Sequence, residues 1–282
     1  MSMVLRQKPF SEPDRSTDTV AEEYDRLCSA MDGFAWYRDQ RILELISNSV
    51  PATCRRGLDI GCGTGIVLHY LAKKHPDVQW TGIDKAPEMV TRTKSKCASL
   101  LNVKASRINW SKLHDNFQIG SFDFILIKNV VHLIDDPVEH LSTLSNILSS
   151  TGRILLVETV SPNSESKKFV SGLSMVLGKM DLKRHIFTAR DFLQIVRAAN
   201  LEILKVQYED QFIEIKKWLD AKARSRQISD HALAYLSSKM NSDLLRRFMK
   251  FEPPGDDFPG RMLRRQILIQ CLPRRNDKTV SK

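Results

Sequence analysis

A glycine-rich stretch between two apolar runs, Leu58-Asp59-Ile60-Gly61-Cys62-Gly63-Thr64-Gly65, constrains this chain more than any other feature. The residues around position 58 predict a short buried strand, and residues 66–71 predict the helix that follows. Such a turn brings backbone N–H groups and a helix N-terminus close to a ligand. Asp84 follows about twenty residues later, after the apolar run 78–83, at the distance where a carboxylate accepts both hydroxyls of a ribose. The sequence therefore predicts an α/β fold that binds a nucleoside.

The spacing of the glycines indicates which nucleoside. A dinucleotide-binding turn has the pattern Gly-x-Gly-x-x-Gly, whereas the glycines here are residues 61, 63 and 65 and residue 66 is Ile. Asp59 would repel a pyrophosphate, but its carboxylate can pair with an ammonium or sulfonium group. The stretch resembles motif I of the class I S-adenosylmethionine-dependent methyltransferases. That resemblance implies a Rossmann-like seven-stranded sheet, mostly parallel with an antiparallel last strand, and helical cap insertions.

The resemblance also implies roles for individual residues, with S-adenosylmethionine as the cofactor and no metal. Asp59 would lie near the methionine amine, Asp84 would hold the ribose, and Asn109 would accept from the adenine amine where many relatives have Asp. Trp110 would flank the adenine ring, or would instead pack on the edge of the sheet. The implied cofactor-binding residues are Tyr24, Asp59, Gly61, Cys62, Gly63, Gly65, Asp84, Lys85, Asn109, Trp110, Lys128 and Asn129.

Tyr24 belongs to this set because Ala21-Glu22-Glu23-Tyr24-Asp25 resembles a segment that precedes motif I in many small-molecule methyltransferases. There the tyrosine lies over the methionine end of the cofactor or over the substrate. Helical spacing of the apolar residues around it equally favours a core tyrosine on an amphipathic helix.

A second motif lies between residues 120 and 137. The continuous apolar run 124–127 predicts a central strand that is covered on both faces. The pattern resembles the fourth motif of the ubiquinone/menaquinone-biosynthesis-like branch of the family. Ligands of open α/β sheets sit outside the carboxyl ends of the strands, which would place Lys128 and Asn129 near the sulfonium. The Asp/Asn-Pro-Pro-aromatic run of methyltransferases that act on exocyclic base amines is missing, so nucleic acid is an unlikely acceptor.

Two residues are candidates for the catalytic base. His132 can take a proton from an acceptor hydroxyl, or it can be a packed residue at the start of a helix. Glu158 ends the predicted strand 153–158 and would point at the mouth of the pocket, either as a general base or as the partner of a lid residue. The sequence does not choose between these alternatives.

The motifs and their surroundings predict five regions. Residues 1–50 would form N-terminal lid helices, 51–159 the cofactor-binding core, and 160–187 a cap over the acceptor. Residues 188–272 would complete the core, interrupted by a helical insertion at 211–260, and 273–282 would be a basic tail. The insertion has an apolar stripe at helical spacing, which is typical of core packing; an extended acceptor pocket or a homodimer contact are the alternatives.

Composition excludes several classes. The formal net charge of +10 favours an anionic partner such as a phosphorylated acceptor, or simply reflects a solvated surface and tail. No apolar run approaches the ~20 residues that span a bilayer, so we expect no membrane span. Five scattered cysteines indicate a reduced, cytoplasmic protein without a structural zinc.

Together these features predict a methyltransferase that acts on a small-molecule acceptor at O, C or N. Two alternatives remain open: a relative that binds S-adenosylmethionine but catalyses a non-methylating reaction such as cyclisation, and an RNA or protein methyltransferase.

Overall fold

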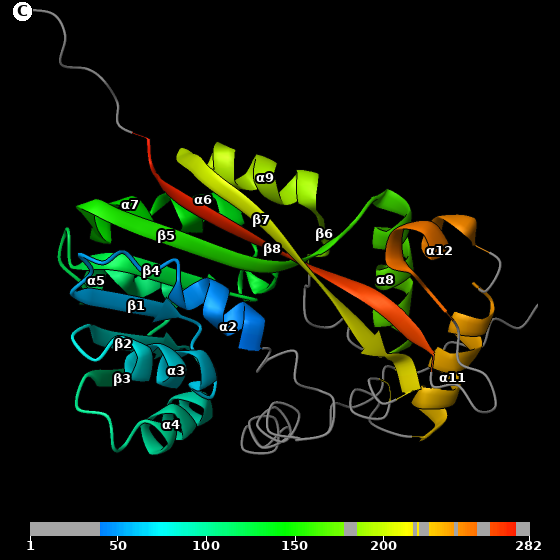
Figure 1. Cartoon of the computed structure of the whole chain (residues 1–282), viewed down its shortest axis with the longest axis horizontal. Coiled ribbons are helices and arrows are strands. Elements are labelled where there is room, and N and C mark those ends of the chain that lie inside the picture. The colour runs from blue at the N-terminus through cyan, green and yellow to red at the C-terminus, as the bar shows by residue number, and fades with distance from the viewer. Residues whose placement is uncertain are drawn as a thin grey trace, which may run out of the picture.

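One mixed β-sheet organises the molecule (Figure 1). The computed structural model describes residues 40–177, 185–216, 219, 226–239, 242–252 and 260–274. The predicted site residue Tyr24, most of the predicted lid helices and residues 275–282 lie outside these ranges. The sheet has the strand order β3-β2-β1-β4-β5-β8-β7.

The fold class expected from the sequence is confirmed. Strands β1 to β5 pair in parallel, and β8 is antiparallel to both of its neighbours, β5 and β7. A two-residue strand, β6 (Phe187–Thr188), adds to the end of β5 and was not expected. The remaining strands are β1 (Arg56–Ile60), β2 (Gln79–Asp84), β3 (Val103–Arg107), β4 (Phe122–Lys128), β5 (Leu148–Ser161), β7 (Leu201–Glu214) and β8 (Arg261–Pro273).

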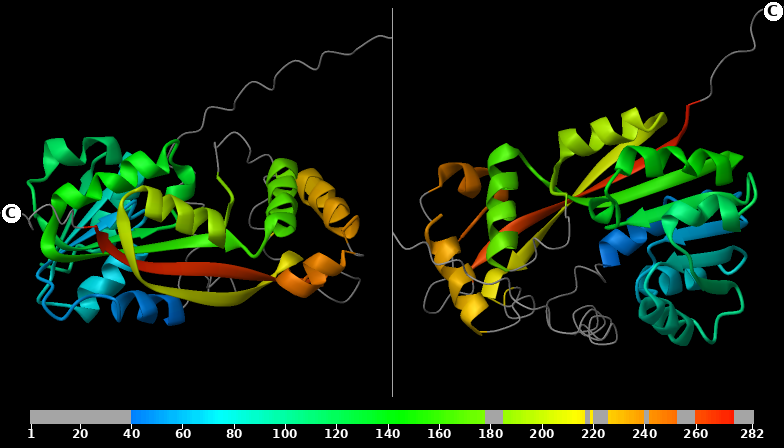
Figure 2. Two further views of the ribbon diagram at one scale, coloured as in Figure 1. Left: turned by 90° about the horizontal axis from the view of Figure 1, so that it is seen from above. Right: turned by 180° about the vertical axis from the view of Figure 1, so that it is seen from behind.

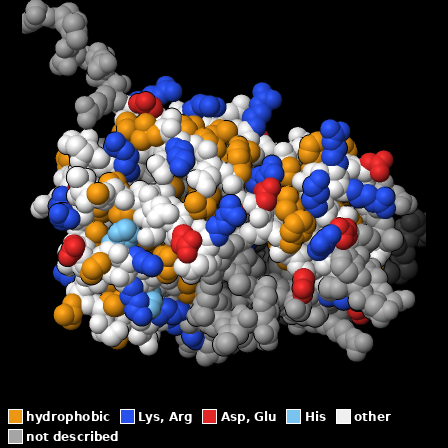
Figure 3. All heavy atoms as spheres, in the orientation of Figure 1, with side chains coloured by type: hydrophobic (Ala, Val, Ile, Leu, Met, Phe, Trp, Pro, Cys, Tyr) orange, Lys and Arg blue, Asp and Glu red, His pale blue; other side chains and the backbone are white. Residues whose placement is uncertain are grey.

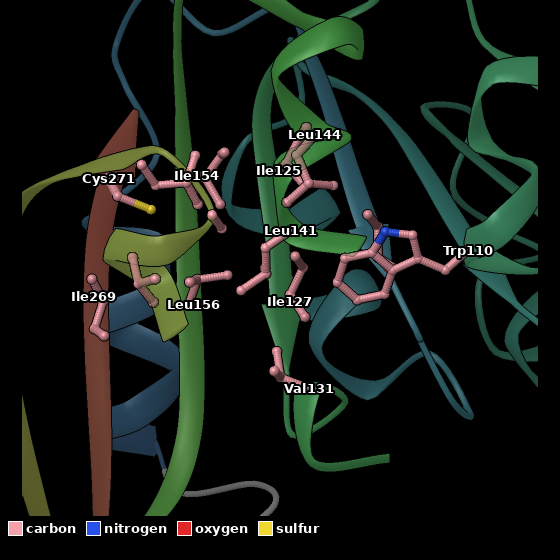
Figure 4. Packing of buried hydrophobic residues seen from close by; sticks show 14 of the residues in the cluster. Trp110, Ile125, Ile127, Val131, Leu141, Leu144, Ile154, Leu156, Ile269 and Cys271 are labelled. Atoms are coloured by element: carbon pink, nitrogen blue, oxygen red, sulfur yellow. The ribbon is translucent and has the colours of Figure 1, made fainter. Parts of the chain in front are cut away.

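Helices cover both faces of the sheet and bury two hydrophobic clusters. One cluster joins α2 and α3 to one face, and the other joins α5, α6, α7 and α9 to the opposite face. In the second cluster Ile127, Leu156 and Ile269 from three neighbouring strands meet Leu141 of α6 (Figure 4). The helices of this part are α2 (Gln40–Ser47), α3 (Ile66–Lys74), α4 (Pro87–Lys96), η2 (Trp110–Lys112), α5 (Leu113–Asn116), η3 (Val131–Leu133), α6 (Pro137–Ser142), α7 (Leu144–Ile147) and α9 (Ala189–Ala198).

Strands β7 and β8 continue past this core as a two-stranded ribbon, and they carry a third hydrophobic cluster at its far end (Figure 2). Helices α8 (Ser164–Val176), α11 (Arg226–Ser237) and α12 (Asp243–Met249) build this cluster. Phe169 of α8 lies at its centre, stacked on Tyr235 and edge-on to Phe251. The two insertions predicted separately at 160–187 and 211–260 therefore contribute to one hydrophobic cluster. We call α8, α11, α12 and the outer ends of β7 and β8 the cap.

Candidate active site

The glycine-rich loop leaves the end of β1 with three glycines in the left-handed region. Their φ angles are +71° at Gly61, +56° at Gly63 and +80° at Gly65, a conformation that residues with a Cβ adopt only at a cost. A Cβ on Gly61 would also lie 2.3 Å from Cγ2 of Val130. The N–H of Gly61 donates to the carbonyl of Ile83, 2.8 Å away. The loop is thus held between the ends of β1, β2 and β4.

Asp84, at the end of β2, holds this loop from the side. Its Oδ2 accepts a hydrogen bond from the N–H of Gly63 and its Oδ1 accepts one from the N–H of Ala86, both at 3.0 Å. A carboxylate oxygen can accept a further hydrogen bond, so these contacts leave room for ribose hydroxyls.

Cys62 follows Gly61 in the loop. Burial raises the pKa of its thiol, which is therefore neutral, and its Sγ lies 3.7 Å from Thr93 Oγ1.

Thr93 is a site residue that the sequence motifs did not indicate. It is fully buried on α4, and its hydroxyl donates to the carbonyl of Gly63 at 2.7 Å. The sequence signal that it offers is weak, because it lies on the buried face of a helix together with Val90. It ties α4 to the loop.

Asp59 is a buried acidic residue at the end of the site formed by β1 and the glycine-rich loop. Only 3% of its surface is exposed, and its Oδ2 has no hydrogen-bond partner within the described residues. Burial raises the pKa of this carboxyl to about 7; the nearby Lys128 cation lowers the pKa and the Asp84 carboxylate raises it. A buried carboxylate without a full set of partners is costly, so this position suits an additional cationic group. The residues present therefore fit the ammonium group of a methionine moiety.

The end of β4 brings a second incompletely bonded residue to the same edge of the sheet. Lys128 ends the strand opposite Val157 of β5. Asn129 follows in the left-handed region at φ +56°, and its N–H donates to the carbonyl of Val157 at 2.8 Å. Its Oδ1 accepts from the Thr159 hydroxyl at 3.4 Å, whereas its buried Nδ2 has no partner in the described part of the chain. Such strained, unsatisfied residues are typical of functional sites.

His132 and Glu158 form a buried pair. The Glu158 side chain is fully buried, and its Oε1 lies 2.9 Å from Nδ1 of His132. Its Oε2 accepts from the His132 N–H at 3.3 Å, while Oε1 also accepts from the N–H of Thr159 at 2.8 Å. A carboxylate on Nδ1 favours the tautomer that carries its proton there, which leaves Nε2 as the basic nitrogen. The sequence singled out both residues but gave no sign that they pair.

Both predicted adenine-binding residues, Asn109 and Trp110, make hydrogen bonds within the protein. Asn109 is exposed, and its Oδ1 accepts from the N–H of Ser111 at 3.3 Å, which caps η2. Trp110 is 8% exposed, packs in the core beside α6 and donates from Nε1 to the carbonyl of His140 at 3.2 Å (Figure 4). Lys85 directly follows Asp84 and is exposed. A role of Asn109 and Trp110 in adenine binding, and of Lys85 in cofactor binding, stays a prediction.

Three wider features bear on the chemistry of the site. No group of three or more metal-ligating side chains occurs in the described residues. Within the same residues, no helix is long and apolar enough to span a bilayer. On the face that Figure 3 shows, Lys and Arg side chains are scattered over core and cap rather than gathered in one basic patch.

Comparison with known proteins places this arrangement in context. Residues 58–154 match a family described as a methyltransferase domain. A demethylmenaquinone methyltransferase of Staphylococcus aureus is 31% identical over 149 residues, which are 52% of this chain and 60% of that protein. The chain spans less than two thirds of the length of this relative and of two other curated proteins that it matches.

Solved structures extend the similarity to the fold of most of the chain. The YcgJ protein of Bacillus subtilis has a TM-score of 0.72 at 23% identity, covering 84% of this chain and 99% of that one. The [4+2]-cyclase SpnF has a TM-score of 0.63 at 18% identity, covering 91% and 93% of the two chains. At these identities the likeness shows a shared fold.

Proposed function

We propose that the protein is a class I methyltransferase that transfers a methyl group from S-adenosylmethionine to a small-molecule acceptor, because residues 58–154 match a methyltransferase domain and a demethylmenaquinone methyltransferase is 31% identical over 149 residues. The observation that carries the proposal is the buried Asp59 carboxylate beside the glycine-rich loop, whose Oδ2 has no hydrogen-bond partner within the described residues. A pyrophosphate would be repelled there, whereas an ammonium would be held by charge.

Each end of the cofactor has a set of residues to hold it. Asp59 would pair with the ammonium, Asp84 would accept from the ribose hydroxyls, and the backbone of residues 61–65 would contact the molecule between them. Lys128 and Asn129 would border the sulfonium. When bound, the cofactor supplies an electrophilic methyl group, so the chain mainly has to orient the acceptor for in-line attack.

His132 is the proposed general base, and Glu158 is a positioning residue. The carboxylate holds the imidazole by Nδ1 and stabilises the cation that forms when Nε2 takes a proton from the acceptor. Substituting Glu158 by Gln would keep the shape of the pair but remove its charge. We expect E158Q to lower kcat more than KM and to shift the acidic limb of the pH–rate profile, whereas a merely structural role would leave that limb in place.

The first test is calorimetric titration with S-adenosyl-L-homocysteine. Asp84→Ala removes charge-assisted hydrogen bonds of about 1.5–3 kcal/mol each, so binding should weaken by more than tenfold. Asp123→Ala is the matched control, because Asp123 Oδ2 likewise accepts from two backbone N–H groups, those of Arg55 and Arg56, at the opposite end of the sheet. Equal affinity of the two variants for the ligand would contradict the assignment of Asp84.

The acceptor is identified with S-adenosylmethionine labelled in its methyl group and an extract of the cells from which the gene comes. Label in a small organic-soluble molecule supports the proposal, and label in RNA or protein contradicts it. An anionic acceptor, a homodimer and a cytoplasmic location stay predictions.

A second candidate function is a cofactor-dependent cyclisation without methyl transfer. It is favoured by the similarity in fold to a [4+2]-cyclase over most of both chains. The two functions separate in the labelling experiment, because a cyclase consumes its substrate while the label stays on the cofactor.

A further inference from the structure

A strip of polar side chains lies on the face of the sheet that α2 covers, where β5, β8 and β7 extend beyond the ends of β1 and β4. The strand register places Thr159 of β5 and Gln266 of β8 side by side, and it places Arg264 of β8 beside Gln211 of β7. These residues alternate with the ones that face α9, and they continue the line of Leu268, which packs in the cluster under α2. We call Asn129, Thr159, Gln211, Arg264 and Gln266 the polar strip.

The polar strip holds buried amide atoms for which the described part of the chain offers no hydrogen-bond partner. The side chain of Gln266 is fully buried, and neither its Nε2 nor its Oε1 has a hydrogen-bond partner within the described residues. The same is true of the buried Oε1 of Gln211 and Nδ2 of Asn129. Buried amides are normally hydrogen-bonded. Three neighbouring amide side chains with unused donors or acceptors therefore indicate that a polar ligand supplies the missing hydrogen bonds.

Hydrogen bonds connect the polar strip to the end of β4. Arg264 donates from both Nε and Nη2 to the Thr159 hydroxyl, at 3.1 Å from Nε, and that hydroxyl donates to Asn129 Oδ1. Asn129 directly follows Lys128, whose charge acts on Asp59. One end of the polar strip therefore borders the proposed cofactor site. Its other edge is closed by Glu209, which is paired with Arg41 of α2 at 2.8 Å.

We propose that the polar strip binds an oxygenated group of the methyl acceptor, one that carries both a carbonyl-type oxygen and a hydroxyl. The amide N–H groups of Asn129 and Gln266 match a carbonyl or carboxylate oxygen, with the Arg264 cation beside them. The amide oxygens of Gln211 and Gln266 match a hydroxyl donor. The inference rests on the proposed function, because it takes the ligand to be the acceptor, and it does not fix the atom that is methylated.

The first experiment compares the thermal unfolding of two variants without ligand. Gln266→Leu removes an unpartnered amide and should raise the melting temperature, since such an amide destabilises the free protein. Gln270→Leu is the matched control on the same strand and face, because Gln270 Nε2 donates to Ser49 Oγ at 3.0 Å; its melting temperature should fall. A fall for Gln266→Leu as large as that for Gln270→Leu would overturn the proposal.

The second experiment measures ligand binding by saturation-transfer NMR in the presence of S-adenosyl-L-homocysteine. The probes are 4-hydroxyacetophenone, which has the carbonyl and the hydroxyl, its carboxylate counterpart 4-hydroxybenzoate, and the apolar isostere 4-isopropyltoluene. We expect the oxygenated probes to bind at millimolar concentration and Gln266→Leu or Gln211→Leu to weaken them about tenfold for each lost hydrogen bond. A preference for the carboxylate identifies the acceptor group as anionic.

Two outcomes overturn the polar strip as an acceptor site. In the first, 4-isopropyltoluene binds as tightly as the oxygenated probes. In the second, the oxygenated probes bind both glutamine variants with the same affinity as the unsubstituted protein. The affinity for S-adenosyl-L-homocysteine is measured on the same samples. If the unsubstituted protein does not bind S-adenosyl-L-homocysteine, the proposed function fails. If it binds this ligand and either outcome above is found, only the present inference fails.

Discussion

The core and the cap are stabilised in different ways. The core is a sheet covered by helices on both faces, and its site is built from neighbouring strand ends within residues 58–158. The cap has its own hydrophobic cluster, drawn from segments around Phe169, Leu236 and Phe251 that are far apart in the chain, and it joins the core mainly through the long ribbon of β7 and β8 (Figure 1). Because the cap cluster is separate from the two clusters of the core, we expect that cap packing and cofactor binding can be perturbed independently.

The largest expected effect tests that independence. Phe169→Ala removes the ring at the centre of the cap cluster and should destabilise the cap by about 3–5 kcal/mol. Because the ring of Phe169 packs against the cap residues Tyr235 and Phe251, we expect unchanged affinity for S-adenosyl-L-homocysteine in calorimetry and faster proteolysis within the cap. Met175→Ala is the control on the same helix, since 60% of that side chain is exposed. Lost cofactor affinity in Phe169→Ala would show that core and cap form one cooperative unit.

The second prediction concerns the charge buried in the core. The folded pKa of Asp59 is about 7, above its ordinary value of 3.8, so between these values the folded state binds one more proton than the unfolded state. The free energy of unfolding without ligand should therefore decrease as pH rises from about 4 to about 7, by about 1.4 kcal/mol per unit of pKa difference. Denaturant titrations of Asp59→Asn should lose this slope.

The affinity for the cofactor should depend on pH in the opposite direction to the free energy of unfolding. Its ammonium pairs with the ionised carboxylate, so affinity for S-adenosyl-L-homocysteine should increase as pH rises through 7 in the unsubstituted protein. The increase should be absent in Asp59→Asn. A pH-independent affinity in the unsubstituted protein would argue against contact between this carboxylate and the ammonium.

The geometry of the glycine-rich loop was predictable because its determinants are local in sequence. The glycines at 61, 63 and 65 do have positive φ angles, and the Asp84 carboxylate does lie beside their loop. A strand, a turn and a helix in immediate succession allow little freedom for other arrangements. What the motifs could not give was the pairing of His132 with Glu158, because it depends on the register of β4 and β5.

The cap and the polar strip were not predictable for physical reasons. The outer part of β7 alternates more and less buried residues, and the outer part of β8 is mostly half-buried, so both lack the continuous apolar run of a central strand. The outer end of β7 therefore fell within the helical insertion that the sequence predicted at 211–260. The association of α8 with α11 and α12 follows from complementary apolar faces far apart in sequence. Gln266 stands next to an apolar run, and its burial becomes visible only when β5 and β7 flank it.

The third prediction separates steric fit from backbone strain in the core. Gly61→Ala and Gly120→Ala both place a Cβ on a residue with φ +71°, so both incur the left-handed penalty of about 1–2 kcal/mol. Only at position 61 does the new Cβ collide, with Val130; at position 120 the nearest atom, Cα of Ser149, is 3.9 Å away. Gly61→Ala should therefore cost about 1–3 kcal/mol more in urea unfolding and should also weaken S-adenosyl-L-homocysteine binding. Equal costs for the two variants would mean that Val130 moves aside freely.

The smallest effect belongs to the ribbon that joins the two regions. Arg265 of β8 forms a bidentate ion pair with Asp210 of β7, in which Nε lies 2.7 Å from Oδ1 and Nη2 lies 2.6 Å from Oδ2. About a third of each side chain is exposed. Because solvent and salt screen such pairs, Asp210→Asn should cost only about 0.2–1 kcal/mol, and less at high salt. The same salt series should leave the cost of Phe169→Ala unchanged, since that ring acts through packing. A larger, salt-insensitive cost of Asp210→Asn would show that pairing within the ribbon, rather than packing of the hydrophobic clusters, limits the stability of the connection between core and cap.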